Sequence, residues 1–366
     1  MRAVIISSSY SYLERITLLE EAYQKQGYET VVLITDFAHA TKKTLKEHKE
    51  GYIFVKTKPY SKNISVQRLY SHIRFAKDAF EEVRNMQVDL LHVLVPANSL
   101  AKEADRYKKS HPDVKLYFDL IDLWPETMPI NHLKNALPFR IWKNLRDRNL
   151  SRADAIYCEC NLYKKVLGVE KDDHYKVLYW AKAMDSIESS PSLSKERIEM
   201  CYLGSVNNII DMDKIIEICK ELEAYKPVRL HLIANGEKKK ELLQKLFANK
   251  VTVLDHGAIY DDRLKQQIFD QCHFGLNIMK SSVCVGLTMK SLDYFRAGLP
   301  ILNNIKGDTS EFVDTYGIGF NVDAEYAEQV KYLQEEDYLQ MRKRVKALYE
   351  EKFSKEAFIA QIEEGK

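Results

Sequence analysis

Short apolar runs alternate with amphipathic stretches from the start of the chain. Ala3–Ile6 is apolar, residues 7–12 are polar and rich in serine, residues 13–26 are amphipathic, and Thr30–Thr35 is apolar again. Runs of this length are typical of buried strands, and a strand–helix–strand order implies parallel strands joined by a right-handed crossover. Further strands are expected in this half at 52–55, 90–95, 115–120, 155–158 and 177–179.

The same order restarts in the second half of the chain. Residues 183–198 contain serine and proline without periodicity, which is typical of a linker. After it, helices are expected at 212–222 and 262–270. The strands of this half are expected at 199–203, 228–233, 251–254, 274–279 and 301–302. The pattern predicts an α/β protein with two Rossmann-like parallel-sheet domains, 1–182 and 199–351, and a length of 366 residues fits two domains.

Composition narrows the class of protein. The chain has 55 basic and 53 acidic residues, a net charge of +2 that does not indicate nucleic-acid binding. No apolar run approaches the roughly 20 residues of a membrane-spanning helix, and the N-terminal run is too short for a secretory signal. The six cysteines show no C-x-x-C spacing and are expected as free thiols. We therefore expect a cytoplasmic protein, at most peripheral on the inner face of the plasma membrane.

The stretch Val285–Pro300, VGLTMKSLDYFRAGLP, predicts a phosphate site. Gly286 permits a tight turn, Thr288 is a suitable N-cap, and the helix that follows stops at Gly298. A helix N-terminus presents unpaired N–H groups and a partial positive charge to anions. Lys290, expected to be exposed in the first turn, adds a full charge, although it is also consistent with an ordinary surface cation. We interpret the stretch as the site of a nucleotide diphosphate.

The first half of the chain gives weaker evidence of a ligand-binding site. Its Ser-rich first loop lacks G-x-G-x-x-G, which argues against a dehydrogenase. Asp122 and Glu126 follow the strand at 115–120, where parallel sheets bind ligands. The alternative is that Asp122 caps a turn and Trp124 packs beneath it.

Two basic helical segments remain open to more than one interpretation. The residues Lys56, Lys58, Lys62, Arg68 and Arg74 form either a solvated face or a surface for a membrane or an acceptor phosphate. Residues 139–152 combine Phe139 and Trp142 with several basic side chains. This combination favours peripheral contact with an anionic bilayer over a simply exposed helix.

Taken in order, these motifs resemble a known family. The second half resembles the second domain of family 4 glycosyltransferases with the GT-B fold. The resemblance rests on four motifs in this order: a strand, Gly204 and a helix; His256-Gly257 with Tyr260; VGLTMKSLDYFRAGLP; and Gly317–Phe320. The motif DLWPE, 122–126, is similar to the signature of a branch that builds bacterial surface polysaccharides. GLTMKSLDYF with NNIKGDT, 303–309, is similar to transferases of Gram-positive capsule and exopolysaccharide clusters.

The resemblance implies two Rossmann-like domains facing a central cleft, with a C-terminal helix, 352–366, packing back on the first. It implies a hexosyltransferase-like enzyme that moves a sugar from a nucleotide-diphosphate donor to a saccharide acceptor. That acceptor is expected to be linked to polyprenyl diphosphate, in surface polysaccharide synthesis. Retention at the anomeric carbon is implied, without a metal or other cofactor. A homo-oligomer is compatible with this interpretation.

The resemblance also places the site residues. Asp122 and Lys290 are the expected catalytic residues, Asp293 the ligand of the donor ribose, and Tyr260 the contact for the base. The complete donor-binding set is Gly204, Ser205, Asn207, Asn235, Gly257, Tyr260, Gly286, Leu287, Thr288, Lys290 and Asp293. The acceptor-side set is Ser9, Tyr10 and Glu126.

The chain departs from the family pattern at three positions. Val285 stands where the first glutamate of E-x7-E is expected, Ser205 where an arginine is common, and Ile121 where a histidine is common. Lys214 is only a loose candidate for the family's lysine, so Lys290 is the hypothetical replacement cation. Asp211-Met-Asp213 has D-x-D spacing, but both acids are interpreted as helix caps. Two alternatives therefore stay open: a non-catalytic GT-B partner of a transferase, or a sugar-nucleotide 2-epimerase.

Overall fold

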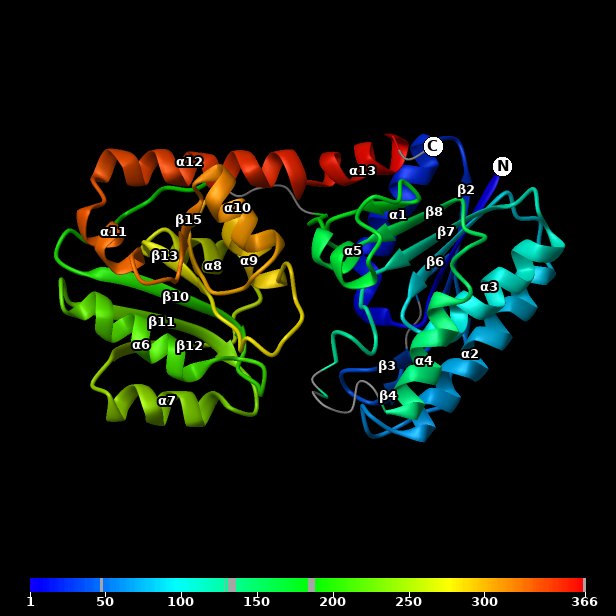
Figure 1. The fold of residues 1–366 in the computed structure, drawn as a ribbon, viewed down its shortest axis with the longest axis horizontal. Helices are drawn as coiled ribbons and strands as arrows, with labels where there is room; N and C mark the ends of the chain where they lie inside the picture. Colours follow the sequence, from blue (N-terminus) through cyan, green and yellow to red (C-terminus); the bar gives the residue numbers. More distant parts are fainter. Residues whose placement is uncertain (47–48, 129, 131–135, 184–187, 365–366) are drawn as a thin grey trace. The chain divides into compact units, whose positions relative to one another are not determined.

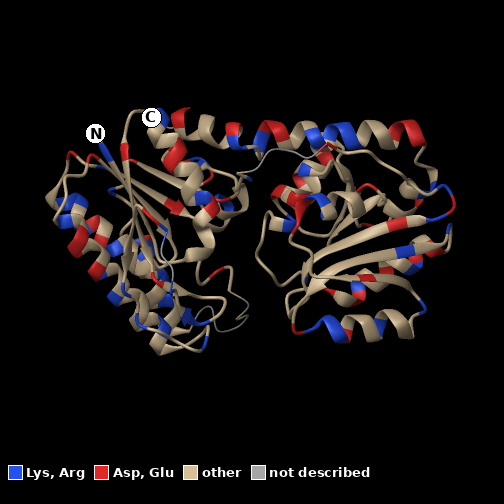
Figure 2. Cartoon of the chain, turned by 180° about the vertical axis from the view of Figure 1, so that it is seen from behind, with Lys and Arg blue, Asp and Glu red and all other residues tan. Residues whose placement is uncertain are grey.

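The computed structural model describes residues 1–46, 49–128, 130, 136–183 and 188–364. The chain divides into two compact units (Figure 1). Unit 1 comprises Met1–Ala183 with Lys355–Lys366, and unit 2 comprises Met184–Ser354. Figure 2 shows that acidic and basic residues lie mainly on the helices and loops, so the strands form the apolar centre of each unit.

Unit 1 is built on a parallel sheet of seven strands in the order β5-β2-β1-β6-β7-β8-β9. Its strands are β1 (Arg2–Ser7), β2 (Glu29–Thr35), β5 (Tyr52–Val55), β6 (Leu90–Val95), β7 (Lys115–Leu120), β8 (Ala155–Cys158) and β9 (Tyr175–Val177), and β3 (Phe37–Ala38) and β4 (Lys43–Thr44) form a separate antiparallel pair. The pattern predicted β5, β6, β7 and β8 with these bounds. The last strand was predicted two residues too late, because the carbonyls of Leu178 and Tyr179 accept hydrogen bonds from Arg15 instead of continuing the sheet.

Helices cover both faces of this sheet. They are η1 (Tyr10–Tyr12, a 3-10 turn), α1 (Leu13–Lys25), α2 (Val66–Arg84), α3 (Asn98–Ser110), α4 (Leu137–Asp147), α5 (Asn161–Leu167) and α13 (Lys355–Glu364). Helix α3 contacts both α2 and α4 on one face, while α13 packs against α1 on the other (Figure 1).

A buried ion pair joins the sheet of unit 1 to helix α1. The Arg15 Nε and one Nη donate to the two carboxylate oxygens of Asp119 at 2.6 and 2.8 Å, and both side chains are fully buried. Two backbone carbonyls accept further Arg15 hydrogen bonds, and the Phe358 ring of α13 lies 5.2 Å from the guanidinium. A buried pair of this kind is stable only with such additional partners.

Unit 2 contains a parallel sheet of six strands in the order β12-β11-β10-β13-β14-β15. The strands are β10 (Ile198–Ser205), β11 (Val228–Asn235), β12 (Thr252–Gly257), β13 (Phe274–Asn277), β14 (Ile301–Asn303) and β15 (Gly319–Asn321). This order is the doubly wound arrangement of nucleotide-binding folds. The pattern did not predict β15. Gly319 brings that strand so close to β14 that an added Cβ would lie 2.0 Å from the Ile301 carbonyl oxygen.

The helices of unit 2 are α6 (Met212–Glu223), α7 (Lys239–Ala248), α8 (Asp262–Phe269), α9 (Met289–Arg296), α10 (Asp308–Tyr316), α11 (Tyr326–Tyr332) and α12 (Glu335–Lys352). Helices α6 and α7 contact each other on one face of the sheet, and α12 contacts α9 and α10 on the other (Figure 1). In the part of the chain that the structure describes, no helix is both long and apolar enough to cross a bilayer.

Candidate functional site

Several of the predicted donor-binding residues lie where the strands of unit 2 end. Gly204, Asn235 and Gly257 lie at the carboxyl ends of β10, β11 and β12, which meet at one edge because the strands are parallel. A cavity of about 200 Å³ opens at this edge. Its lining includes four predicted donor residues, Gly204, Asn235, Tyr260 and Asp293.

Tyr260 and Asn235 form one wall of this cavity. The Asn235 Nδ2 donates to the Tyr260 hydroxyl at 3.3 Å, and the Tyr260 ring is 81% exposed. An exposed ring held at its polar end is suited to stacking on a planar base. Gly236 follows Asn235 in the chain. At this position the backbone lies so close to Val206 that an added Cβ would be 2.4 Å from the Val206 carbonyl oxygen, so only glycine fits.

Lys290 lies in the first turn of α9, over the ring of Tyr202. Its Nζ is 4.5 Å from the ring centroid and 3.4 Å from the Tyr202 hydroxyl. The expectation that Lys290 is exposed is wrong, because the start of α9 faces β10 and partly buries the side chain. Burial lowers the pKa of the Lys290 ammonium to about 7. Among the described residues, no carboxylate lies within ion-pair distance of this ammonium.

The loop before α9 is held firmly. The Gly286 carbonyl accepts two hydrogen bonds from Thr309, one from the backbone N–H at 2.9 Å and one from the side-chain hydroxyl at 2.7 Å. Thr288 is the N-cap, and its own N–H donates to the Ser291 Oγ at 3.3 Å in a capping box. The Thr288 N–H is therefore already engaged. The backbone N–H groups of Leu287 and Met289 make no hydrogen bond to any residue that the structure describes, as is usual at a helix start.

Asp293 lies three residues after Lys290 on the same helix. Residues three apart share one face of a helix, so the carboxylate and the ammonium point toward the same side of α9. The cavity, the lysine and the helix N-terminus thus lie around one edge of the sheet of unit 2.

Other predicted donor residues contribute less directly. Ser205 is exposed at the end of β10, outside the lining of the cavity. The Asn207 Oδ1 accepts a hydrogen bond from the Ile209 N–H at 3.1 Å and thereby shapes a turn. Lys265 lines the cavity and was not predicted. It forms an ion pair with Asp262 at 2.6 Å on α8. In the sequence, Lys265 looks like any other charged residue of this helix.

The loosely matched family positions have structural partners. The Lys214 Nζ forms an ion pair with Glu217 at 2.8 Å. Asp211 caps α6 by accepting from the Lys214 N–H at 3.0 Å, as predicted. Asp213 was also predicted to cap this helix, but its carboxylate pairs with Lys245 at 2.6 Å.

A second group of polar side chains lies at the carboxyl edge of the unit 1 sheet. Asp122 follows β7, and its Oδ2 accepts a hydrogen bond from the Tyr12 hydroxyl at 2.8 Å. Burial raises the pKa of the Asp122 carboxyl to about 6. Glu159, directly after β8, was not predicted. Burial raises its pKa to about 8, and the negative charge of Asp122 adds to the shift.

Two cations lie over the Tyr60 ring, and the charge of one of them, Arg68, reaches Asp122. The Arg68 guanidinium stacks 4.2 Å from the Trp124 ring centroid and lies 5.6 Å from the Tyr60 ring, over which Lys42 also lies at 5.0 Å. Burial lowers the pKa of Lys42, and the charge of Arg68 lowers it further. Neither cation has a carboxylate within ion-pair distance in the described part of unit 1. Two cations that repel each other and have no ion-pair partner are suited to an anionic ligand.

An apolar cavity of about 260 Å³ adjoins Arg68. It is lined by Asn63, Ile64, Ser65, Val66, Arg68, Leu69, His72, Trp124, Met128, Pro138, Phe139 and Trp142.

The acceptor-side predictions have different surroundings. The Ser9 Oγ accepts from the Ser11 N–H at 3.3 Å as the cap of η1, which begins at Tyr10. Glu126 pairs with Arg146 at 3.0 Å and with Lys143 at 2.9 Å. Because the Arg146 side chain is fully buried, these contacts give Glu126 a structural role.

Helix α4 contains residues 139–147 of the predicted membrane segment, 139–152. Trp142 and Arg146 are buried in unit 1, whereas Leu137 and Ile141 are 68% and 59% exposed. Peripheral membrane contact stays a prediction, and it now depends on these two aliphatic residues.

Comparison with solved structures identifies the architecture. HepE of Anabaena, solved with UDP and glucose, superposes with a TM-score of 0.66 at 13% identity, over 100% of this chain and 98% of its own. The apo form of WaaB, a lipopolysaccharide outer core galactosyltransferase, gives 0.64 at 12% identity, over 100% and 99%. Staphylococcus aureus TarM, solved as a variant with UDP, fondaparinux and α-GlcNAc-glycerol, gives 0.68 at 7% identity, over 100% and 99%.

The chain has the GT-B fold. The predicted fold class, two Rossmann-like parallel-sheet domains, is thereby confirmed. No protein-family model matches the sequence, and no curated protein matches it either. At these identities the likeness extends to the GT-B fold alone, and membership of family 4 stays a prediction.

Proposed function

We propose that this GT-B protein is a glycosyltransferase that moves a sugar from a nucleoside-diphosphate donor to a saccharide acceptor. Unit 2 binds the donor and unit 1 handles the acceptor. The observation that carries the proposal is the partly buried Lys290 ammonium, which has no carboxylate partner in the described chain and lies at the N-terminus of α9. A cation left without a counter-ion in a partly buried position is costly unless a ligand supplies the negative charge.

The donor is best described as a uridine diphosphate sugar. The Asp293 carboxylate can accept both ribose hydroxyls, and Tyr260 offers a ring face to the base. HepE and TarM were both solved with UDP, which supports the choice of nucleotide.

Bond breakage at the anomeric carbon leaves negative charge on the diphosphate. Lys290 and the N–H groups of Leu287 and Met289 are the groups that stabilise this charge. Asp122, held by Tyr12, contacts the acceptor hydroxyl. Following the family resemblance, we propose retention at the anomeric carbon and a transfer step that needs no metal ion.

The acceptor of this proposal is a lipid-linked saccharide of surface polysaccharide synthesis. Arg68 and Lys42 suit a phosphate of the lipid carrier, and the adjoining apolar cavity suits the first part of its chain. The exposed Leu137 and Ile141 would then bring α4 to the membrane surface.

A panel of UDP-, GDP- and dTDP-sugars tests the donor. We expect UDP to bind in calorimetric titration, and one UDP-sugar to release UDP slowly by hydrolysis and faster with an added saccharide acceptor. Proton NMR of the products separates a transferase from a 2-epimerase, because an epimerase inverts the configuration at C2 of the sugar and a transferase leaves it unchanged.

The departures from the family pattern at Val285 and Ser205 support a second candidate, a non-catalytic partner of a true transferase. That candidate is favoured if no nucleotide in the panel binds and the protein co-purifies with another transferase.

A further inference from the structure

A second cavity of unit 2 lies at the edge of the sheet opposite to the donor cavity. Its volume is about 380 Å³, within the range of about 300–1,000 Å³ that is usual for small-ligand sites. Its lining includes Ile198 and Phe274, the first residues of β10 and β13. Gly204 and Asn235 lie near or at the other ends of β10 and β11, and these strands are parallel, so the two cavities are separate sites.

The cavity has an apolar floor and a basic rim. Ile198, Phe274, Val330 and Leu333 supply apolar surface, and the rim comes from the segment before β10, the turn after α6, the end of α11 and the start of α12. Its charged lining residues are four basic ones, Lys195, Arg197, Lys226 and Lys331, against the single acid Glu335.

Most of these charges are already engaged. Lys195 pairs with Glu335 at 3.3 Å, and both side chains are largely exposed. The Lys331 Nζ lies 5.0 Å from the Tyr225 ring centroid and 4.8 Å from that of Tyr332.

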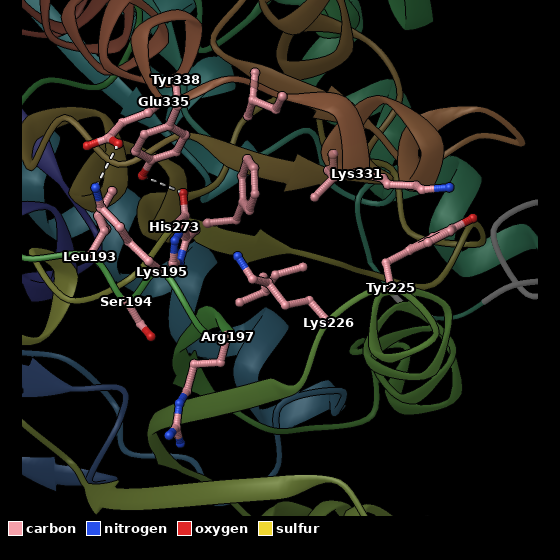
Figure 3. A pocket seen from close by; sticks show the side chains of 14 residues that line it. Leu193, Ser194, Lys195, Arg197, Tyr225, Lys226, His273, Lys331, Glu335 and Tyr338 are labelled. Atoms are coloured by element: carbon pink, nitrogen blue, oxygen red, sulfur yellow. Dashed lines mark hydrogen bonds and ion pairs between the residues drawn. The ribbon is translucent and has the colours of Figure 1, made fainter.

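Lys226 differs from the other basic residues. Figure 3 shows its side chain extending into the middle of the cavity, toward His273. The residue is partly buried, and its ammonium group makes no hydrogen bond or ion pair with any residue that the structure describes.

Lys226 points toward His273, whose ring is neutral and cannot act as a counter-ion for the ammonium. The His273 Nδ1 accepts a hydrogen bond from the Glu199 N–H at 3.1 Å. Burial lowers the pKa of His273 to about 4 against the opposing effect of the Glu199 carboxylate, so the ring is neutral near pH 7, and the positive charge of Lys226 lowers the pKa further. Among the described residues, the middle of the cavity therefore holds one ammonium group without an ion-pair partner, above an apolar floor.

We propose that this cavity binds a small organic anion with an apolar body and a single carboxylate. The carboxylate accepts hydrogen bonds from Lys226, and the apolar body covers Phe274 and Val330. One central ammonium matches one negative charge, and a charge-assisted hydrogen bond in a partly buried site is stronger than a neutral one. The ligand contacts the segment that leads into β10 and the start of α12, and it does not take part in the transfer reaction.

Octanoate is the first probe, titrated by calorimetry against the full chain at pH 7.5. Two matched compounds separate the two parts of the site: 1-octanol has the apolar body without the charge, and inorganic phosphate has the charge without the body. We expect octanoate to bind at least about tenfold more tightly than either compound, because both parts contribute.

Variants then assign the site. Lys226→Gln should weaken octanoate binding about tenfold, Lys226→Arg should retain most of it, and Lys240→Gln, an exposed lysine of α7 outside the cavity lining, should change nothing. Thermal melting of each variant checks folding. Equal affinities for octanoate and octanol, or an unchanged affinity in Lys226→Gln, would overturn the proposal.

A competition experiment separates this inference from the proposed function. The octanoate affinity should be the same with and without saturating UDP, since the two cavities lie at opposite edges of the sheet. Displacement of octanoate by UDP would place octanoate in the donor site and refute a separate site.

Discussion

The affinity of this protein for UDP should depend on pH through Lys290. Its pKa lies near 7 in the free protein because burial disfavours the charged form. A bound diphosphate favours the ammonium form, so the pKa rises on binding and the complex takes up a proton. The ammonium is present below the free-state pKa, and affinity should therefore fall as pH rises above about 7.

The size of the effect follows from the fraction of free protein that carries the ammonium. With a pKa of about 7, that fraction falls from about one half at pH 7 to about 3% at pH 8.5, which corresponds to a loss of roughly sixteenfold in affinity, or about 1.6 kcal/mol. Solvent reaches part of the side chain and screens the charge, so a loss of about fivefold is the smallest we expect. Proton uptake at pH 8 should approach about 0.9 per UDP bound.

Isothermal titration of UDP in two buffers with different ionisation enthalpies measures both quantities. The useful range is pH 7 to 8.5, because the terminal phosphate of UDP titrates near about 6. Lys290→Met is the matched variant: it keeps an apolar stem over Tyr202 and removes the charge. It should bind UDP about tenfold to a hundredfold more weakly at pH 7, as expected for the loss of a hydrogen bond to a charged group, and without pH dependence.

A constant UDP affinity between pH 7 and 8.5 with no net proton uptake would refute the role of Lys290. So would a Lys290→Met variant that binds UDP as the natural chain does. A melting temperature of the variant that is no lower than that of the natural chain is the control, because the natural side chain has no ion pair whose loss would destabilise the fold.

Three further predictions test the site. Asp293→Ala should weaken binding of UDP and uridine about tenfold but leave pyrophosphate affinity unchanged, measured by calorimetry; equal losses would contradict the ribose assignment. The pKa of Asp122 is raised to about 6, so kcat/KM of sugar transfer should fall as pH decreases below about 6. Asp122→Asn should abolish transfer while UDP still binds. A kcat/KM that stays constant below about pH 6 would exclude a role for ionised Asp122. Glu126→Gln should lower the free energy of unfolding in urea by roughly 1–3 kcal/mol, because it leaves the buried Arg146 with fewer charged partners; unchanged stability with lost transfer would instead support the predicted acceptor-side role of Glu126.

The pattern of apolar residues predicted most of the sheet in both units. Strands of a parallel sheet are covered on both faces, so they are continuous apolar runs, and β5 to β8 could be located to the residue. The short strands β3, β4 and β15 carry no such signal. The position of β15 depends on how closely Gly319 approaches β14, a contact that local periodicity does not contain.

Part of the site could also have been predicted. Glu159 follows β8 as Asp122 follows β7, and the rule that selected Asp122 applies equally to both. The burial of Lys290 was not predictable, because helical periodicity does not say which neighbour the first turn of α9 faces. Arg68 was included among the basic residues of α2, but its stacking on Trp124 joins elements that are distant in the sequence.

Whether a charged residue has an ion-pair partner depends on the tertiary fold, and it is the criterion by which we propose ligand contacts in this chain. Arg15 and Asp119 are 104 residues apart and neutralise each other in the core of unit 1. Lys290, Arg68 and Lys226 are equally basic in the sequence, yet each lies partly buried without a carboxylate partner in the described chain. Keeping a partly buried charge unneutralised lowers stability, and a bound anion removes that cost. These three positions are therefore the ones at which we propose that the protein binds anions.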